Sequence, residues 1–247
     1  PYMDGFRQIK KYISEGKFTG IFSAVQMFVI SNGVDTKYFS ADTELNEKFI
    51  SGWLDKDNNP VTDYIDFAKS VLRIPQAHEM IARYTVLDED AKKLILLRPY
   101  QIHAIESIRE ASKIGKSGFV WHTTGSGKTL TSFKTAQLAS KLEYIDKVLF
   151  VVDRKDLDYQ TMKEYDRFQK GAANGNRSTK VLQKQLEDTT SKIIVTTIQK
   201  LSEFVKRNKN HPVYQKHLVL IFDECHHSQF GDMHKICLLY TSPSPRD

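Results

Sequence analysis

The sequence predicts an α/β fold in which helices flank a parallel β-sheet. Three apolar runs, Val148–Val152, Ile193–Val195 and Leu218–Phe222, have the near-continuous hydrophobicity of strands that are buried on both faces. Helical patterns separate these runs, one from about Asp156 and one around Thr197 to Lys206. Strands that alternate with helices favour a doubly wound sheet, which binds its ligand at the carboxyl ends of the strands.

The first part of the chain is predicted to be a mixture of helices and strands. Phe6, Ile9 and Ile13 recur at helical spacing and predict a helix near the N-terminus. Met27 to Ile30, followed by Ser-Asn-Gly, predicts a strand and a turn, and Thr36 to Phe39 is its expected hairpin partner.

A polar linker and two helices are expected next. Asp55 to Pro60 is polar and closes with proline, as linkers commonly do. Thr62 is the predicted N-cap of a helix that runs through Leu72, and Pro75 is expected to start another helix.

The second part of the chain has a more regular pattern, which begins after Arg98-Pro99. Besides the three buried strands and the helices between them, it contains four expected elements. These are a helix marked by Ile102, Ile105 and Ile108, a strand at Phe119–Trp121, a helix at Leu130–Leu142, and a Gly/Asn-rich loop near Gly171–Asn176.

Composition restricts the class of protein and its compartment. With 247 residues, of which 40% are hydrophobic, the chain can bury one good core and part of a second. The longest apolar stretch, Ile21 to Ile30, is too short for a membrane span, and no secretory signal opens the chain. Two cysteines in no paired spacing fit a reducing cytoplasm, which is the predicted location. The net charge of +6 permits nucleic-acid binding without establishing it.

The strongest motif joins the predicted strand at Phe119–Trp121 to the helix that follows it. The chain reads His122-Thr-Thr-Gly-Ser-Gly-Lys-Thr129 there. Small residues let backbone N–H groups approach phosphates, and a helix N-terminus favours negative charge. Lys128 can reach the β- and γ-phosphates while the Thr129 hydroxyl ligates Mg²⁺. The alternative is a Gly-rich surface turn.

The predicted nucleotide-binding residues of this loop are Thr124, Gly125, Ser126, Gly127, Lys128 and Thr129. His122 stands where the P-loop pattern usually has its first glycine. The loop therefore resembles the variant found in helicase-type ATPases.

An acidic pair, Asp223-Glu224, directly follows the last predicted strand. Asp223 can reach Mg²⁺, and Glu224 can polarise an attacking water. Strands often end in acidic turns, so the pair gains its meaning from the phosphate-binding loop upstream. Lys128, Asp223 and Glu224 are the predicted catalytic residues, and Thr129 and Asp223 the predicted magnesium ligands.

The neighbouring residues Cys225, His226, His227 and His234 also raise the possibility of a zinc site. Consecutive residues that leave a strand cannot easily converge on one metal, and no second Cys-x-x-Cys or His-x₃-His element completes a ligand set. An ordinary turn is the preferred interpretation.

Five short motifs follow one another along the chain. They are Arg98-Pro-Tyr-Gln101, His122–Thr129, Asp153-Arg-Lys-Asp-Leu-Asp158, Thr196-Thr-Ile-Gln-Lys200 and Asp223-Glu-Cys-His226. In this order they resemble the motifs of superfamily 2 helicases, and their residues are most similar to those of the motor (R) subunit of type I restriction enzymes. The resemblance covers nearly all of residues 1–236.

The resemblance implies a RecA-like motor domain that uses ATP and Mg²⁺. Gln101 is expected to read the adenine, with Arg98 and Tyr100 shaping its pocket. Residues in the third and fourth motifs match those that touch the DNA backbone in such motors, and hydroxyls and helix N-termini suit that role. The candidate DNA contacts are Arg154, Thr196, Thr197 and Lys200. N-caps and solvated helix faces are the alternative for each of them. His227 stands where this family more commonly has Arg.

The opening segment resembles the end of the nuclease domain that such R subunits carry. Gln8 and Tyr12 are spaced i, i+4 on one helix face and resemble an accessory motif of that domain. An amphipathic surface helix is the alternative. The nuclease's catalytic Asp and Glu-x-Lys do not precede Gln8, so no nuclease activity is expected from this chain itself.

The resemblance also implies a division of the chain. Residues 1–75 are assigned to the C-terminal part of the nuclease domain with linker helices, and residues 76–236 to the first RecA-like motor domain. Residues 237–247 are predicted to be the translation of a sequencing adapter rather than genuine protein sequence.

The predicted function is the ATP-binding half of the DNA-translocating subunit of a type I restriction enzyme. Its expected partners are double-stranded DNA and the methyltransferase and specificity subunits. Because the chain starts at Pro1 and lacks the later motifs, it is expected to be a fragment that hydrolyses little ATP by itself. The alternatives are another superfamily 2 translocase, another class of P-loop enzyme, or a non-catalytic DNA-binding or subunit-docking module that retains the loop.

Overall fold

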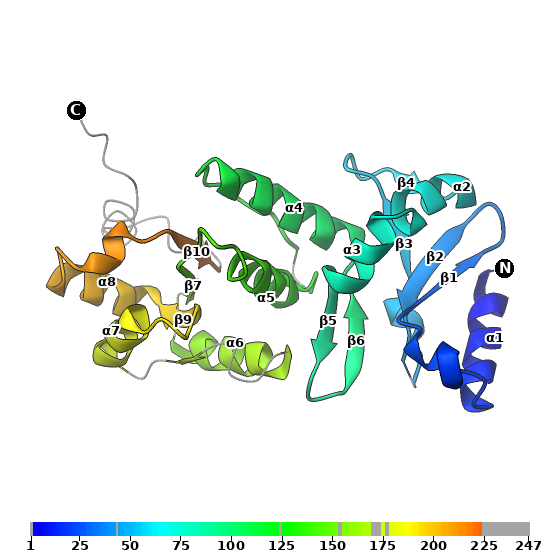
Figure 1. Cartoon of the computed structure of the whole chain (residues 1–247), viewed down its shortest axis with the longest axis horizontal. Helices are drawn as coiled ribbons and strands as arrows, with labels where there is room; N and C mark the ends of the chain where they lie inside the picture. The colour runs from blue at the N-terminus through cyan, green and yellow to red at the C-terminus, as the bar shows by residue number, and fades with distance from the viewer. Residues whose placement is uncertain are drawn as a thin grey trace. The chain divides into compact units, whose positions relative to one another are not determined.

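The chain forms two compact units, residues 1–121 and residues 122–247 (Figure 1). This computed structural model describes residues 2–42, 44–123, 125–152, 155–168, 174–175 and 178–223, without the side chains of 155–160 and 174–175. The domain boundary predicted after residue 75 falls inside the first unit, and that assignment stays a prediction. Within the described part of the chain, none of the helices combines the length and the apolar character needed to cross a bilayer.

The first unit opens with a helix packed against an antiparallel sheet. Phe6 of helix α1 lies in an apolar cluster with Ile30, Phe39 and Leu45, which come from the first two strands and the loop after the second. The predicted hairpin at residues 27–39 is confirmed, because strands β1 and β2 pair in antiparallel register. The elements are α1 (Tyr2–Ser14), η1 (Gly20–Ala24), β1 (Met27–Ser31), β2 (Thr36–Ser40), η2 (Glu47–Phe49), β3 (Ser51–Leu54) and β4 (Pro60–Val61), and the sheet order is β1-β2-β3-β4.

The polar stretch at residues 55–60 was predicted to be a linker, and that prediction is wrong. It is the tight turn between β3 and β4. The Asp55 carboxylate accepts hydrogen bonds from the backbone N–H groups of Asp57 and Asn59, at 2.9 and 2.8 Å. Turns and linkers share the same residue types, because both need side chains that satisfy exposed backbone groups.

Short helices and a hairpin follow this sheet. The helix expected from residue 62 begins one residue later, because Asp63 is its N-cap and accepts from the N–H groups of Ile65 and Asp66. The elements are α2 (Tyr64–Phe67), a π-helical turn η3 (Ala68–Leu72), α3 (Gln76–Ala82), β5 (Thr85–Asp88), β6 (Lys93–Leu96) and α4 (Pro99–Lys113).

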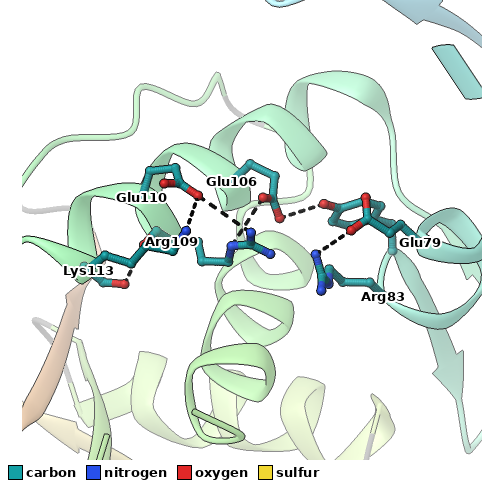
Figure 2. A network of polar contacts seen from close by, with 8 residues as sticks. Glu79, Arg83, Glu106, Arg109, Glu110 and Lys113 are labelled. Carbon is teal, nitrogen blue, oxygen red and sulfur yellow. Dashed lines mark hydrogen bonds and ion pairs between the residues drawn. The ribbon is translucent and has the colours of Figure 1, made fainter. Parts of the chain in front are cut away.

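A polar network joins the α3 region to α4 (Figure 2). The Tyr84 hydroxyl donates to Glu106 Oε1 at 2.6 Å, which links the chain just after α3 to the middle of α4. Arg109 lies 3.4 Å from Glu106 and 3.6 Å from Glu110, so the ion pairs continue along α4. Burial, and then the hydrogen bond to Glu106, raise the pKa of Tyr84, so its hydroxyl remains a donor.

The strand predicted at Phe119–Trp121 is not formed, so that prediction is wrong. These three residues have no regular secondary structure, and Phe119 and Trp121 are 78% and 97% exposed. A run of only three apolar residues buries little surface, and it becomes a strand only where a sheet edge pairs with it. Its hydrophobicity therefore does not determine its conformation.

The second unit contains the parallel sheet that the sequence predicts. The sheet order is β10-β7-β9-β8, and each described pair is parallel. Val151 of β7 is level with Phe222 of β10 on one side and with Thr196 of β9 on the other. The carboxyl ends of these three strands therefore lie at one edge of the sheet. The strands are β7 (Lys147–Val152), β8 (Asn174–Gly175), β9 (Ile193–Thr197) and β10 (Leu218–Phe222).

Helices cover both faces of this sheet. Leu149 and Val151 pack with apolar side chains of α7 and α8 on one face. Phe150 points to the other face, where its ring lies 5.4 Å from that of Tyr165 in α6, and Tyr165 lies 5.2 Å from Phe133 in α5. This mixed α/β arrangement is consistent with a RecA-like domain. The helices are α5 (Lys128–Ala139), α6 (Lys155–Phe168), α7 (Thr179–Glu187), α8 (Ile198–Arg207) and η4 (Pro212–Gln215).

Candidate nucleotide-binding site

The predicted phosphate-binding loop leads directly into a helix. Gly125 and Gly127 have φ of 75° and 80°, a left-handed conformation that costs glycine little. Gly127 is the N-cap of α5, so Lys128 and Thr129 are the first two residues of that helix. Thr124 lies outside the described residues. Other residues adopt this conformation only at a cost, so the glycines favour the turn into α5.

The N-terminus of α5 suits an anion. No side chain caps it in the described structure, because its N-cap is a glycine. The first N–H groups of a helix lack intrahelical partners, and the helix dipole places partial positive charge at the same end. A phosphate positioned there could accept these N–H groups and pair with the Lys128 ammonium.

His122 and Ser126 hold the loop together from within. The Ser126 hydroxyl donates to the Thr123 carbonyl at 2.7 Å, and His122 Nδ1 lies 3.1 Å from the same hydroxyl oxygen. Since the hydroxyl proton is used on the carbonyl, the geometry fits Nδ1–H as the donor to Ser126. Burial, and then the nearby Lys128 cation, lower the pKa of His122, which favours the neutral imidazole.

Asp223 lies at the carboxyl end of β10. Its backbone N–H donates to the Val151 carbonyl at 3.0 Å, so the sheet fixes its position. Its carboxylate is close enough to Tyr165 to contribute to the raised pKa of that hydroxyl, after the larger effect of burial. Tyr165 also contacts the loop's own helix, because its hydroxyl lies 3.1 Å from Ser132 Oγ in α5. The end of β10 and α5 therefore approach the same buried side chain. Glu224 lies outside the described residues.

The predicted adenine-reading residues belong to the first unit. Gln101 is 3% exposed, and its Oε1 accepts from the Arg98 backbone N–H at 2.9 Å, so it closes the N-terminus of α4. The Arg98 guanidinium donates to the Lys48 carbonyl at 3.0 Å. Tyr100 is half-buried. Their role toward adenine stays a prediction.

Two of the predicted DNA contacts are buried side chains. Thr196 and Thr197 are both 0% exposed, and the Thr197 hydroxyl caps α8 by accepting from the Lys200 N–H at 3.3 Å. The structure thus shows the N-cap role that was the alternative for Thr197. The Lys200 side chain is half-buried, and Arg154 lies outside the described residues.

Gln8 and Tyr12 share one face of α1, as their spacing predicts. Gln8 Nε2 donates to the Tyr12 hydroxyl at 2.6 Å, and both side chains are exposed. Their accessory role in a nuclease stays a prediction. The residues considered for zinc, Cys225, His226, His227 and His234, lie outside the described part of the chain, and the described part contains no cluster of metal-binding side chains.

Sequence reasoning missed Tyr165 and Ser132, which connect α6 to α5. A signal was available for Ser132, because it lies one helical turn after Lys128 and thus on the same face of α5. Tyr165 carried no comparable signal, because a tyrosine in an amphipathic helix is usually part of the core.

Comparisons with known proteins identify the family. A family model described as the res subunit of type III restriction enzymes matches residues 94–245. The match includes most of the segment predicted to derive from an adapter, and that origin stays a prediction. The type I restriction enzyme SauCOLORF180P endonuclease subunit of Staphylococcus aureus (strain COL) is 46% identical over 239 residues, covering 94% of this chain.

More distant relatives carry similar names. The C-terminal part of the type I restriction enzyme MpnIIP endonuclease subunit of Mycoplasma pneumoniae is 45% identical over 198 residues, which cover 73% of this chain and 95% of that protein. The EcoprrI endonuclease subunit of Escherichia coli is 34% identical over 110 residues, which are 42% of this chain and 35% of that protein.

The chain spans 25% of the length of the staphylococcal relatives. Its identity to them extends over both compact units, because the alignments cover 94% of it. The chain therefore belongs to the family of type I restriction enzyme endonuclease (R) subunits, and it contains their restriction-enzyme helicase-like domain.

Proposed function

We propose that this chain is the ATP-binding part of the motor with which a type I restriction endonuclease subunit moves along double-stranded DNA. The names of its relatives support the restriction system, and the order of its motifs supports the motor. The methyltransferase and specificity subunits of such an enzyme are its proposed partners, because the relatives are named as subunits of type I enzymes.

One observation carries the proposal. Gly127 adopts a left-handed conformation and starts α5, so Lys128 and Thr129 lie in the first turn of a helix whose N-terminus attracts anions. The Lys128 ammonium would neutralise phosphate charge, and Thr129 and Asp223 would hold Mg²⁺. Bound Mg²⁺ would neutralise charge that develops on the phosphates during hydrolysis, and Glu224 would orient and deprotonate the attacking water.

Measurement of ATP binding by the chain tests this proposal. Lys128→Ala should weaken the binding of ATP·Mg²⁺ by at least about tenfold, or about 1.4 kcal/mol. Lys141→Ala is the matched control, because it removes an exposed lysine just beyond the end of α5 and should leave the affinity unchanged. Equal affinities for the wild-type chain and Lys128→Ala would end the proposal.

A docking or DNA-binding module that merely retains the loop predicts a different result. Its DNA affinity would fall with increasing salt and would ignore ATP. In the longer subunit, Glu224→Gln would then behave as wild type, whereas a motor would lose hydrolysis.

A further inference from the structure

Tyr165 is a buried tyrosine whose hydroxyl points to the helix of the phosphate-binding loop. It is 0% exposed, and its ring packs between Phe133 of α5 and Phe150 of β7. A buried hydroxyl needs a hydrogen-bond partner. Tyr165 Oη donates to Ser132 Oγ at 3.1 Å, and helices α5 and α6 pack together at this point.

The hydrogen bond continues into the first turn of α5. Ser132 Oγ donates in turn to the Thr129 carbonyl at 3.0 Å. Each hydroxyl has only one proton, so the direction of the chain is fixed from Tyr165 through Ser132 to Thr129. Thr129 is the residue proposed to hold Mg²⁺ through its side chain.

The acidic residue at the end of β10 also affects the Tyr165 hydroxyl electrostatically. Burial chiefly raises its pKa, and the carboxylates of Asp223 and Glu164 add to that effect. One buried side chain on α6 therefore contacts the α5 half of the proposed ATP site through Ser132, and the charge of Asp223 in the β10 half acts on it.

Helix α6 begins at Lys155, directly after Asp153-Arg154, where contact with the DNA backbone is predicted. Ten residues of helix, or about 15 Å, separate Lys155 from Tyr165. A shift of α6 when DNA binds at its N-terminus would therefore move Tyr165 against α5. Helices move as rigid elements, and buried hydrogen bonds transmit such movements.

We propose that Tyr165, through Ser132, is a positioning residue that couples DNA binding at the start of α6 to the first turn of the phosphate-binding helix. The inference rests on the proposed ATP-driven motor. It adds a specific link by which DNA accelerates ATP hydrolysis.

The test uses the full-length subunit in its complex, with ATP hydrolysis measured with and without duplex DNA. Tyr165→Phe keeps the ring and removes the hydroxyl, and Ser132→Ala removes the other side of the contact. Each should reduce DNA stimulation of hydrolysis about fivefold, the effect of about 1 kcal/mol for one hydrogen bond, while the affinity for ATP without DNA stays within about twofold of wild type. The double variant should be no worse than Ser132→Ala, because that variant already removes the bond to Tyr165.

Tyr38→Phe is the matched control. It removes another buried tyrosine hydroxyl, which donates to the Leu97 carbonyl at 2.9 Å in the first unit. It should leave DNA stimulation unchanged. Melting temperatures of all the variants separate a lost link from a destabilised fold.

Two results would overturn the inference. One is wild-type DNA stimulation in Tyr165→Phe. The other is an equal loss of activity with and without DNA, which a purely structural role would produce. Failure of the motor proposal is distinguishable, because wild-type protein would then show no ATP hydrolysis that depends on Lys128.

Discussion

Single residues in the second unit show how polar groups are kept in its core. Lys147 is 2% exposed, and its ammonium donates to the backbone carbonyls of Gln185, Asp188 and Ser191. These carbonyls lie at the end of α7 and just beyond it, where intrahelical partners run out. The cation therefore caps the C-terminal end of α7, and these hydrogen bonds offset part of the cost of burying its charge.

Lys134 of α5 is a second buried lysine, and it should make stability depend on pH. It is 4% exposed, and its ammonium donates to Gln137 Oε1 at 2.9 Å. Burial, and then the Lys141 cation, lower its pKa from 10.5 to about 8. Between these two pH values the unfolded chain binds the proton and the folded chain does not. The free energy of unfolding should therefore rise with pH across this window.

Chemical denaturation at several pH values measures the effect. Lys134→Met removes the titrating group, so the stability of the wild-type chain should rise relative to that of the variant from pH 8 to pH 10.5. Lys180→Met removes an exposed lysine of α7 and should hardly change how the free energy of unfolding depends on pH. If the free energy of unfolding changed with pH in the same way in the wild-type chain and in Lys134→Met, the lowered pKa of Lys134 would be contradicted.

At the scale of helices and strands, the cap of α8 depends on one hydroxyl. Thr197 Oγ1 accepts from the Lys200 N–H at 3.3 Å and satisfies one of the first N–H groups of that helix. Thr197→Val keeps the shape of the side chain and removes the acceptor, so it should destabilise the chain by about 1 kcal/mol. Hydrogen exchange at the Lys200 amide should become faster in Thr197→Val and should stay unchanged in Thr197→Ser. Equal exchange in Thr197→Val and wild type would show that the cap contributes nothing.

Strands were predictable where their burial is extreme or their turn is specific. The runs at 148–152, 193–195 and 218–222 are strands β7, β9 and β10, because a parallel sheet with helices on both faces needs strands with apolar side chains on both faces. The first hairpin was predictable from its Ser-Asn-Gly turn, in which Asn32 Oδ1 accepts from the N–H groups of Val34 and Asp35. The segment Phe119–Trp121 was not predictable, because pairing along a sheet edge is not encoded in three residues.

At the scale of the whole molecule, the glycine turn that starts α5 was predictable from the sequence, but the contacts that support it were not. The loop is a local feature, in which glycines, a lysine and a helix start follow one another. The buried contact between Tyr165 and Ser132 joins residues 33 positions apart, so it depends on how α5 and α6 pack. The position of Asp223 beside Val151 was likewise not predictable, because it is set by the register of β10 against β7.

The two compact units should also differ in what they contribute to the proposed restriction enzyme. Gln8 and Tyr12 lie in the first unit and Lys128 in the second. If the exposed Gln8–Tyr12 pair serves a nuclease, Gln8→Ala should reduce DNA cleavage by the full complex at least about tenfold, or about 1.4 kcal/mol in activation free energy. ATP hydrolysis stimulated by DNA should remain at the wild-type level, because the phosphate-binding loop is unchanged. Lys10→Ala, an exposed residue on the same helix, should leave both activities intact.

Lys128→Ala is the opposite case, because in the proposed function cleavage follows translocation and so needs the motor. It should abolish both ATP hydrolysis and cleavage, so only Gln8→Ala would separate the two activities. Assays of both reactions on one DNA substrate distinguish the variants. Full cleavage by Gln8→Ala would exclude the accessory role of the N-terminal helix. Joint loss of hydrolysis and cleavage in Gln8→Ala would instead show that α1 supports the motor, and the assignment of residues 1–75 to a nuclease domain would then lose its main functional support.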